Sequence, residues 1–291
     1  MIYQKDRQYS LVIGQGKGSG VEINNLHITF RVSKSSDNKK NPAKANISIY
    51  NLSEEYQRYV EEPFVEVVLS VGYDGVGMKR LFSGQVTIAG TEKRGTDIIT
   101  ELQIDSLYTE LNHKVVSKTL QSGTTIKKVI ETVVEQMEGV SRVVFAGNTI
   151  NTQFVDGYSI TQSPRQVLND LASAYEIEWQ VDDGVLYVND RAKSYMTNNS
   201  KAFVISETSG MIERPYFDNI EKQRGKKDKV KAKRKGVKVK ILLNPALTAG
   251  SIVKMEYAEF TGFYKIERLT HHGEYYGESW YSDLVLGTML K

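Results

Sequence analysis

Short runs of alternating apolar and polar residues fill the first 106 positions and predict β-strands. Residues 45–50 read Ala-Asn-Ile-Ser-Ile-Tyr, which has the two-residue period of a strand that buries one face. One short helix is expected after Ser53, because serine is a favourable N-cap residue. Several strands at this spacing are typical of a sandwich or barrel. The other strand-like runs, separated by turns rich in Gly and Asp, cover residues 21–23, 26–30, 64–71, 79–89 and 97–104.

A helical period appears in the middle of the chain. Two helices are predicted there. One begins after Ser163, with Pro164 at its first position. A β-hairpin should follow over residues 177–188, with its turn at the Asp-Asp-Gly sequence of residues 182–184. These elements predict a small α/β domain. The other helix of this region precedes it, over residues 124–137. It is predicted from the helical spacing of Ile126, Val129, Ile130, Val133, Val134 and Met137.

The last third of the chain returns to strand-like runs. A short strand is expected at residues 202–205, and residues 238–243, 251–257, 262–270 and 280–286 predict a meander of four strands. The fold class predicted from these patterns is mainly β with a small α/β domain. The expected domains are residues 1–106 (β), 107–199 (α/β) and 200–291 (β).

Composition excludes several classes of function. The 291 residues include no cysteine, so disulfide scaffolds, thiolate metal sites and cysteine nucleophiles are excluded. The N-terminus becomes charged at once and resembles no signal peptide. No apolar run approaches the roughly 20 residues that a membrane-spanning helix needs. We therefore expect a soluble protein made in the cytosol, without stable membrane insertion.

Two sequence motifs suggest ligand binding but fit it poorly. Residues 14–20 are rich in glycine, yet their spacing fails both nucleotide-binding fingerprints and a strand, not a helix, follows them. We therefore expect a hairpin loop. His271 and His272 are adjacent, and adjacent side chains in a strand point to opposite faces, so they cannot readily chelate one ion.

Acidic pairs occur at Glu54-Glu55, Glu61-Glu62 and Asp182-Asp183. Adjacency in sequence does not create the geometry of a general acid and base, and no Gly-x-Ser-x-Gly motif marks a serine nucleophile. We predict no enzymatic activity, no cofactor, and no catalytic or metal-binding residue.

A basic segment, residues 221–240, is the most informative feature of the charge pattern. It holds eleven Lys or Arg and two acidic residues, a charge of +9. The whole chain carries +3, so the remainder carries −6. The alternation from residue 229 onward predicts a hairpin with one lysine-rich face and a turn at residues 234–236. The residues proposed for docking to a protein are Lys226, Lys227, Lys229, Lys231, Lys233, Arg234 and Lys235.

Three interpretations of the basic segment stay open. The first is a solvated sheet edge whose lysines oppose aggregation. The second is docking to an acidic neighbouring protein. The third is contact with DNA or acidic lipid, although few aromatic residues are interleaved for stacking on single strands.

Three segments, taken in order, resemble baseplate hub proteins of contractile-tailed phages, which are related to the hub part of type VI secretion spike proteins. The first is residues 45–53, a strand that runs straight into a helix. The second is residues 163–188, the predicted helix and hairpin. The third is residues 242–253, followed by residues 262–273 and Trp280. The sequence departs from the family pattern at about residues 221–236.

The resemblance implies an architecture and a role. Each chain would form two β-barrels like those of a tail tube, and three chains would close into a ring with pseudo-sixfold symmetry. Such a trimer would join a sixfold tail tube to a threefold central spike and line the channel for DNA ejection. The implied partners are two further copies, the tube or adjoining ring proteins, the spike and a tape-measure protein. The implied location is the virion baseplate, assembled in the host cytoplasm.

Two alternatives remain from the sequence alone. A distal tail or tube-terminating protein would share the barrel pattern but form a hexamer. A carbohydrate- or surface-binding β-module would use the 17 tyrosines as binding platforms and need not be trimeric.

Overall fold

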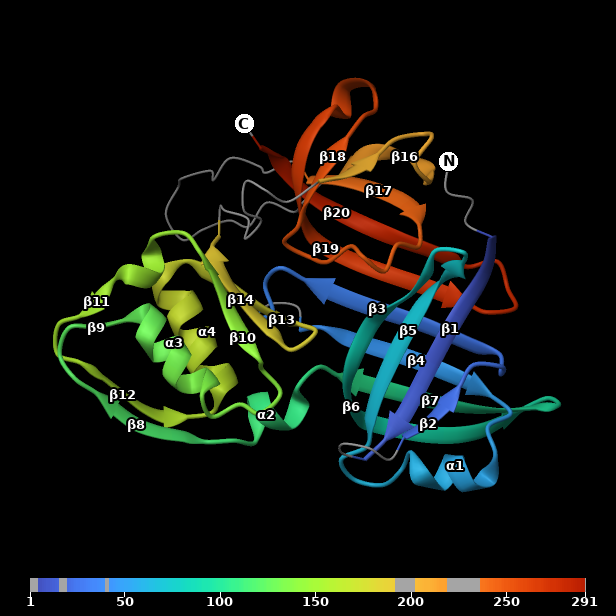
Figure 1. Ribbon diagram of the computed structural model, residues 1–291, viewed down its shortest axis with the longest axis horizontal. Helices are drawn as coiled ribbons and strands as arrows, with labels where there is room; N and C mark the ends of the chain where they lie inside the picture. The colour runs from blue at the N-terminus through green and yellow to red at the C-terminus, as the bar shows by residue number, and fades with distance from the viewer. Residues whose placement is uncertain (1–4, 16–19, 40–41, 192–201, 219–235, 291) are drawn as a thin grey trace.

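The computed structural model describes residues 5–15, 20–39, 42–191, 202–218 and 236–290 (Figure 1). One sheet of 13 strands contains the strands of both the N-terminal and the C-terminal thirds of the chain. A unit of helices and small sheets, formed by the middle third, packs beside it. The fold is therefore mainly β with a smaller α/β part, as the sequence predicts.

The strands of the N-terminal unit fall where the alternating runs predict them. In β4, the apolar residues Ala45, Ile47 and Ile49 are buried while Asn46 is exposed. The order β3-β4-β7-β6-β5-β1-β2 is antiparallel throughout. The bounds are β1 (Lys5–Gly14), β2 (Gly20–Ile23), β3 (Ile28–Ser35), β4 (Lys44–Tyr50), β5 (Glu66–Asp74), β6 (Gly77–Arg94) and β7 (Asp97–Asp105).

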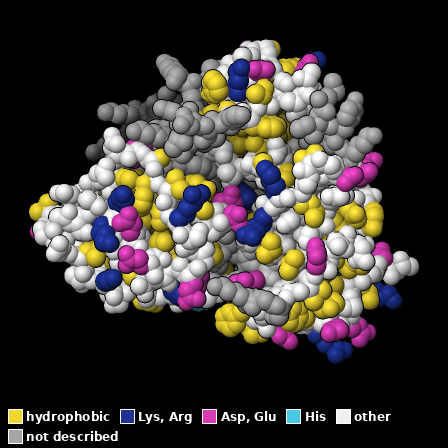
Figure 2. Space-filling view, viewed as in Figure 1, with side chains coloured by type: hydrophobic (Ala, Val, Ile, Leu, Met, Phe, Trp, Pro, Cys, Tyr) yellow, Lys and Arg dark blue, Asp and Glu magenta, His cyan; other side chains and the backbone are white. Residues whose placement is uncertain are grey.

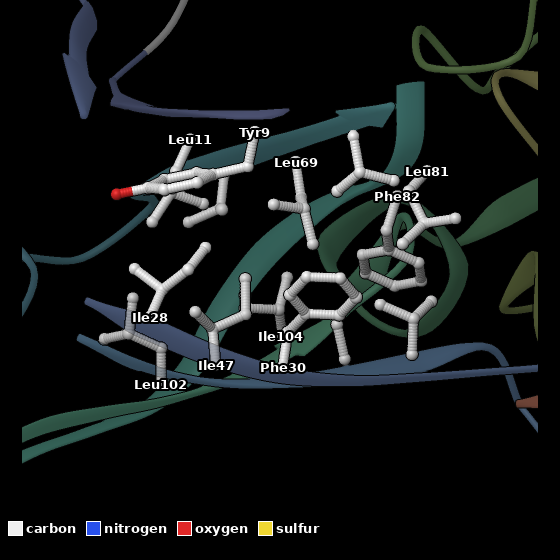
Figure 3. Close-up of a cluster of buried hydrophobic side chains, with 14 of the residues drawn as sticks. Tyr9, Leu11, Ile28, Phe30, Ile47, Leu69, Leu81, Phe82, Leu102 and Ile104 are labelled. Carbon is white, nitrogen blue, oxygen red and sulfur yellow. The ribbon is translucent and has the colours of Figure 1, made fainter. Parts of the chain in front are cut away.

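The N-terminal unit curls so that its strands face each other across a core. Figure 3 shows Tyr9, Leu11 and Leu69 from β1 and β5 above Ile28, Ile47 and other residues from β3, β4 and β7. Burying these apolar side chains stabilises the fold by about 25 cal/mol per Å² removed from water. The curled sheet is the structural reason for the alternation in sequence.

The short helix α1 (Glu54–Tyr59) lies between β4 and β5, where the sequence places it. Ser53 occupies the N-cap position, but its hydroxyl makes no capping hydrogen bond. The side chain of Gln57 donates instead to the backbone carbonyl of Leu52. The position of the helix is therefore correct, whereas the expected capping bond is wrong.

The C-terminal unit differs from the predicted meander. Strands β18, β19 and β20 do follow one another, but β17 pairs with β20 on the far side and not with β18. An unpredicted strand, β16, pairs with β17 and ends the sheet. The bounds are β15 (Phe203–Ile205), β16 (Met211–Asp218), β17 (Gly236–Leu242), β18 (Ile252–Met255), β19 (Gly262–Glu274) and β20 (Trp280–Leu290).

The two β units join into one sheet through β19 and β3. Seven residues of each strand pair antiparallel, from Arg268 opposite Ser35 to Glu274 opposite Thr29. The units also share core residues, since Leu243 and Trp280 pack into the N-terminal core. Neither unit closes into a barrel by strand pairing among the described residues. The two expected tube-like β-barrels are therefore two curled parts of one sheet, and neither is closed within the described part of the chain.

The α/β unit, residues 107–191, has a core of its own. Helices α3 (Ile126–Val134) and α4 (Pro164–Tyr175) pack on the hairpin of β13 (Ile177–Asp182) and β14 (Val185–Asp190). Both helices and the hairpin are where the sequence predicts them. The remaining elements are α2 (Tyr108–Asn112), β8 (Val116–Leu120), β9 (Thr124–Thr125), β10 (Arg142–Ala146), η1 (Thr149–Asn151), β11 (Gln153–Phe154) and β12 (Tyr158–Gln162).

Local chemistry sets the ends of these elements. The Ser163 hydroxyl accepts a hydrogen bond from the backbone N–H of Gln166, and Pro164 takes the first position of α4. The β13–β14 turn places Asp183 and Gly184 at φ 48° and 71°, the left-handed values that a two-residue type I′ hairpin requires. The turn thereby fixes the register between β13 and β14.

Candidate functional site

The seven basic residues proposed for docking, Lys226 through Lys235, lie outside the described residues. The two ends of this stretch are described: Asp218 of β16 lies opposite Gly236 of β17 in an antiparallel pair. Strand β17 thus pairs with β16 on one side and with β20 on the other, so the predicted pairing of residues 237–241 across a turn at 234–236 is wrong. The predicted turn at residues 234–236 falls largely outside the described part of the chain.

The described end of the basic segment has the predicted alternation. Val237, Val239 and Ile241 of β17 are buried, while Lys238 and Lys240 are on the other face. Lys240 forms an ion pair with Glu213 of β16 and lies over the ring of Tyr281, 4.9 Å from its centroid. The hydrogen bond that Lys240 donates to Glu213 raises the pKa of Lys240. This lysine is therefore held within its own sheet.

Strand β16 ends the large sheet and carries three partly exposed apolar side chains. Ile212, Tyr216 and Phe217 are each about half exposed, at 47%, 54% and 49%. This strand was not predicted from the sequence, and Pro215 interrupts its apolar run. Proline lacks a backbone N–H and is tolerated mainly in edge strands, so Pro215 could have indicated an edge.

Strand β2 forms the opposite end of the sheet. It pairs antiparallel with β1, as expected for a hairpin around residues 14–20. Gln15, just before the undescribed loop residues, donates to the Glu62 carboxylate and to the Pro63 carbonyl, both at 3.0 Å. Phe64 follows with a left-handed φ of 64° and 67% exposure. A large exposed aromatic residue in this backbone region is uncommon.

The two adjacent histidines point to opposite faces of β19, as predicted. His271 is fully buried and its Nδ1 lies 2.7 Å from the Ser282 hydroxyl. Burial and the nearby charges of Lys34 and His272 hold the pKa of His271 well below 6.5. His272 instead lies 3.3 Å from Asp283. No group of three or more potential ligands gathers for a metal among the described residues.

The predicted acidic pairs separate into two kinds. Glu54, Glu55, Glu61 and Glu62 are exposed around α1. Asp182 and Asp183, in contrast, lie at the polar junction, the contact between the β13–β14 hairpin and the large sheet. There Asp182 Oδ1 lies 2.6 Å from Lys34 Nζ, and Asp183 pairs with Arg80.

The polar junction contains a second ion pair that is more deeply buried. Lys265 Nζ of β19 lies 2.6 Å from Glu178 Oε2 of β13, with side-chain exposures of 8% and 11%. Figure 2 shows basic and acidic side chains gathered where the α/β unit meets the large sheet. This cluster could not be predicted from local sequence, because Lys265 and Glu178 are 87 positions apart and Lys34 and Asp182 are 148 positions apart.

A family model described as baseplate hub gp41 matches residues 11–259. The chain belongs to the baseplate hub gp41 family. This family of structural baseplate proteins is the one that the order of sequence segments predicts, and it assigns the chain to the tail baseplate. No curated protein sequence matches this hub.

Solved structures of low identity share the fold of this hub. The tail protein from Neisseria meningitidis MC58 aligns with a TM-score of 0.63 and 12% identity over 96% of both chains. The 43 kDa tail protein of prophage MuSo2 from Shewanella oneidensis aligns with a TM-score of 0.61 and 10% identity, covering 96% of this chain and 98% of its own.

The c3393 protein of E. coli has a TM-score of 0.57 and 11% identity, with 97% of the hub and 77% of c3393 covered. It is described as a type VI secretion component similar to the T4 tail proteins gp27 and gp5. At these identities the likeness concerns the fold alone. Among the described residues of the hub, no helix is long and apolar enough to cross a membrane.

Proposed function

We propose that this chain is the structural hub of a tail baseplate, and that three copies form a ring joining a sixfold tail tube to a threefold central spike. The observation that carries the proposal is the shared sheet. Each chain holds two curled β units side by side, joined by β19 and β3. Three chains in a ring would therefore present six β units.

The ends of the sheet support ring formation. Strand β16 ends one side and β2 the other, and unpaired strand edges tend to pair with another chain. A contact between two different surfaces closes only if the rotation between copies completes a circle. The exposed residues Ile212 and Tyr216 of β16 are suited to burial in such a contact.

The partners follow from this role. We propose contacts with the central spike on the threefold side and with the tail tube or adjoining ring proteins on the sixfold side. A tape-measure protein inside the tube is a further candidate partner. DNA would meet the hub only by passing through its channel, in a virion assembled in the host cytoplasm. The hub works by shape and symmetry, without enzymatic turnover.

We assign docking to an acidic neighbouring protein to the basic segment, residues 221–240. Its charge of +9, on a chain whose remainder carries −6, favours an acidic partner. The segment connects β16 and β17 at the end of the sheet, where a neighbour would approach in the ring.

Electron microscopy of the purified hub mixed with its spike tests the ring. The expected class averages, viewed along the axis, have six lobes from three chains. Lysine substitution of Ile212 and Tyr216 should leave the fold intact and abolish the ring. A matched control is Ile88→Lys, at an exposed position on β6. Rings of six chains, or single particles under all conditions, would refute the proposal.

A further inference from the structure

The α/β unit meets the rest of the hub differently from the way in which the two β units meet each other. The β units share a sheet and core residues, including Trp280. In the part of the chain that the structure describes, the buried core of the α/β unit draws only on residues of that unit, from Leu111 to Val188. An element with its own apolar core can keep its fold when its neighbour moves away.

Polar groups of strand β13 make the principal contacts across the polar junction. Lys265 pairs with Glu178, and Lys34 with Asp182, which also accepts a hydrogen bond from Thr248. Two hydrogen bonds that involve the backbone cross the junction as well. The Gln180 side chain donates to the Ala249 carbonyl at 2.7 Å, and the Asn38 N–H donates to the Trp179 carbonyl at 2.8 Å.

The buried ion pair at Glu178 is costly to form. Removing two charges from water can cost more than their attraction returns. Burial raises the pKa of Glu178, and the pull of Lys265 in the opposite direction does not cancel that effect. Asp37 and Glu267 also face this carboxylate and raise its pKa further. The charged pair therefore fixes one orientation of the α/β unit without holding it strongly.

The chain enters the α/β unit through a residue suited to a hinge. Leu107 has a left-handed φ of 48° directly before α2. A non-glycine residue in this region is strained, because its Cβ lies too close to the following carbonyl oxygen. A change of backbone angle at Leu107 would relieve that strain while the large sheet and the α/β core stay intact.

We propose that the polar junction is a latch, and that the α/β unit, residues 107–191, leaves the large sheet as a rigid body when the latch opens. The movement takes place within one chain and does not require the trimer. The movement gives the hub two arrangements of the same folded parts, which a tail could use during assembly or ejection.

The latch should depend on pH in a defined direction. A carboxyl group whose pKa is raised in the docked state favours docking most when it is protonated. The contribution of Glu178 to docking is therefore complete below the ordinary Glu pKa of 4.5 and is lost as the pH rises through the raised pKa of Glu178. The charged or titratable groups that face the Glu178 carboxylate are Lys265, Asp37 and Glu267.

Distance measurements between two spin labels test the latch. The chain has no cysteine, so Asn46→Cys on β4 and Gln166→Cys on α4, both exposed, give one labelled pair. At about pH 5 we expect one narrow distance, and at about pH 8 a growing longer component. Lys265→Met should increase that component at least about a hundredfold, because it leaves Glu178 buried without its partner.

The apolar pair Glu178→Leu with Lys265→Met serves as the matched variant. It should restore a single narrow distance at both pH values, since no charge remains to be buried. Amide hydrogen exchange in α3 reports whether the α/β unit stays folded. An unchanged distance in Lys265→Met overturns the proposal. So does loss of α3 protection together with the change of distance, because the unit would then unfold instead of moving.

Discussion

The ring of Trp280 lies edge-to-face with that of Phe30, with centroids 5.4 Å apart. Trp280 begins β20 of the C-terminal unit, and Phe30 belongs to β3 of the N-terminal unit. The contact therefore links two units that are about 250 residues apart in sequence. The guanidinium of Arg7 lies 5.5 Å from the same indole and extends the link to β1.

Removing this indole should weaken the hub strongly. We predict that Trp280→Ala lowers the free energy of unfolding by about 3–5 kcal/mol, because a large cavity replaces a buried ring. Trp280→Phe, which keeps an aromatic ring against Phe30, should cost clearly less. Urea unfolding followed by circular dichroism measures both. Equal losses for the two variants would contradict the assigned packing.

Two serines at helix starts offer a matched comparison. Ser163 accepts a capping hydrogen bond at the start of α4, whereas the Ser53 hydroxyl makes no such bond at the start of α1. Ser163→Ala should therefore cost about 0.5–2 kcal/mol, and Ser53→Ala markedly less. Thermal unfolding of both variants tests this difference, and a larger loss for Ser53→Ala would contradict it.

His271 should make stability fall in mild acid. Its pKa is held well below 6.5 in the folded chain, chiefly by burial. Unfolding returns the pKa to about its ordinary value, so the unfolded chain binds more protons as the pH falls below 6.5. The contribution of neutral His271 is thus complete above that pH and is lost below it, by up to about 1.4 kcal/mol per pH unit.

The variant His271→Asn keeps a polar side chain beside Ser282 but cannot titrate. Its free energy of unfolding should vary less between about pH 5 and about pH 7 than that of the unchanged protein. Urea unfolding at several pH values measures the two slopes. Identical slopes would mean that another group governs acid stability.

The basic segment can be tested without disturbing the fold. Serine should replace Lys226, Lys227, Lys229, Lys231, Lys233, Arg234 and Lys235 together. We predict an unchanged circular dichroism spectrum and weaker assembly with neighbouring tail proteins, because the docking charge is lost. Complementation of a tail lacking the native hub measures assembly. Normal tail yield would remove the docking role and favour the solvated edge.

Local patterns predicted individual elements of the hub well. The helical spacing of Val129 and Val133 gave α3, and the Asp-Asp-Gly turn gave the β13–β14 hairpin. Strand β16 was not predicted, because it contains Pro215. Proline is compatible with an edge strand but not with a central one, and the sequence does not show which of the two a strand will be. The predicted partner of β17 was also wrong, since β17 pairs with β20 and not with β18. Alternation shows which face of a strand is buried but not which strand lies beside it.

The polar junction lay beyond sequence reasoning for a related reason. Lys34 and Lys265 stand in strands with ordinary alternation, and nothing local distinguishes them from surface lysines. Only the folded chain brings them to Asp182 and Glu178. The family, by contrast, could be predicted, because the order of several weak segments persists along nearly the whole chain.

Absolute mass in solution distinguishes a trimeric hub from a hexamer and from a monomer. Light scattering should be recorded over a concentration series of the hub, first alone and then with the spike protein added. We expect a mass of three 32.9 kDa chains, at the latest when the spike is present. A stable hexamer, or a monomer that persists with the spike, would contradict it.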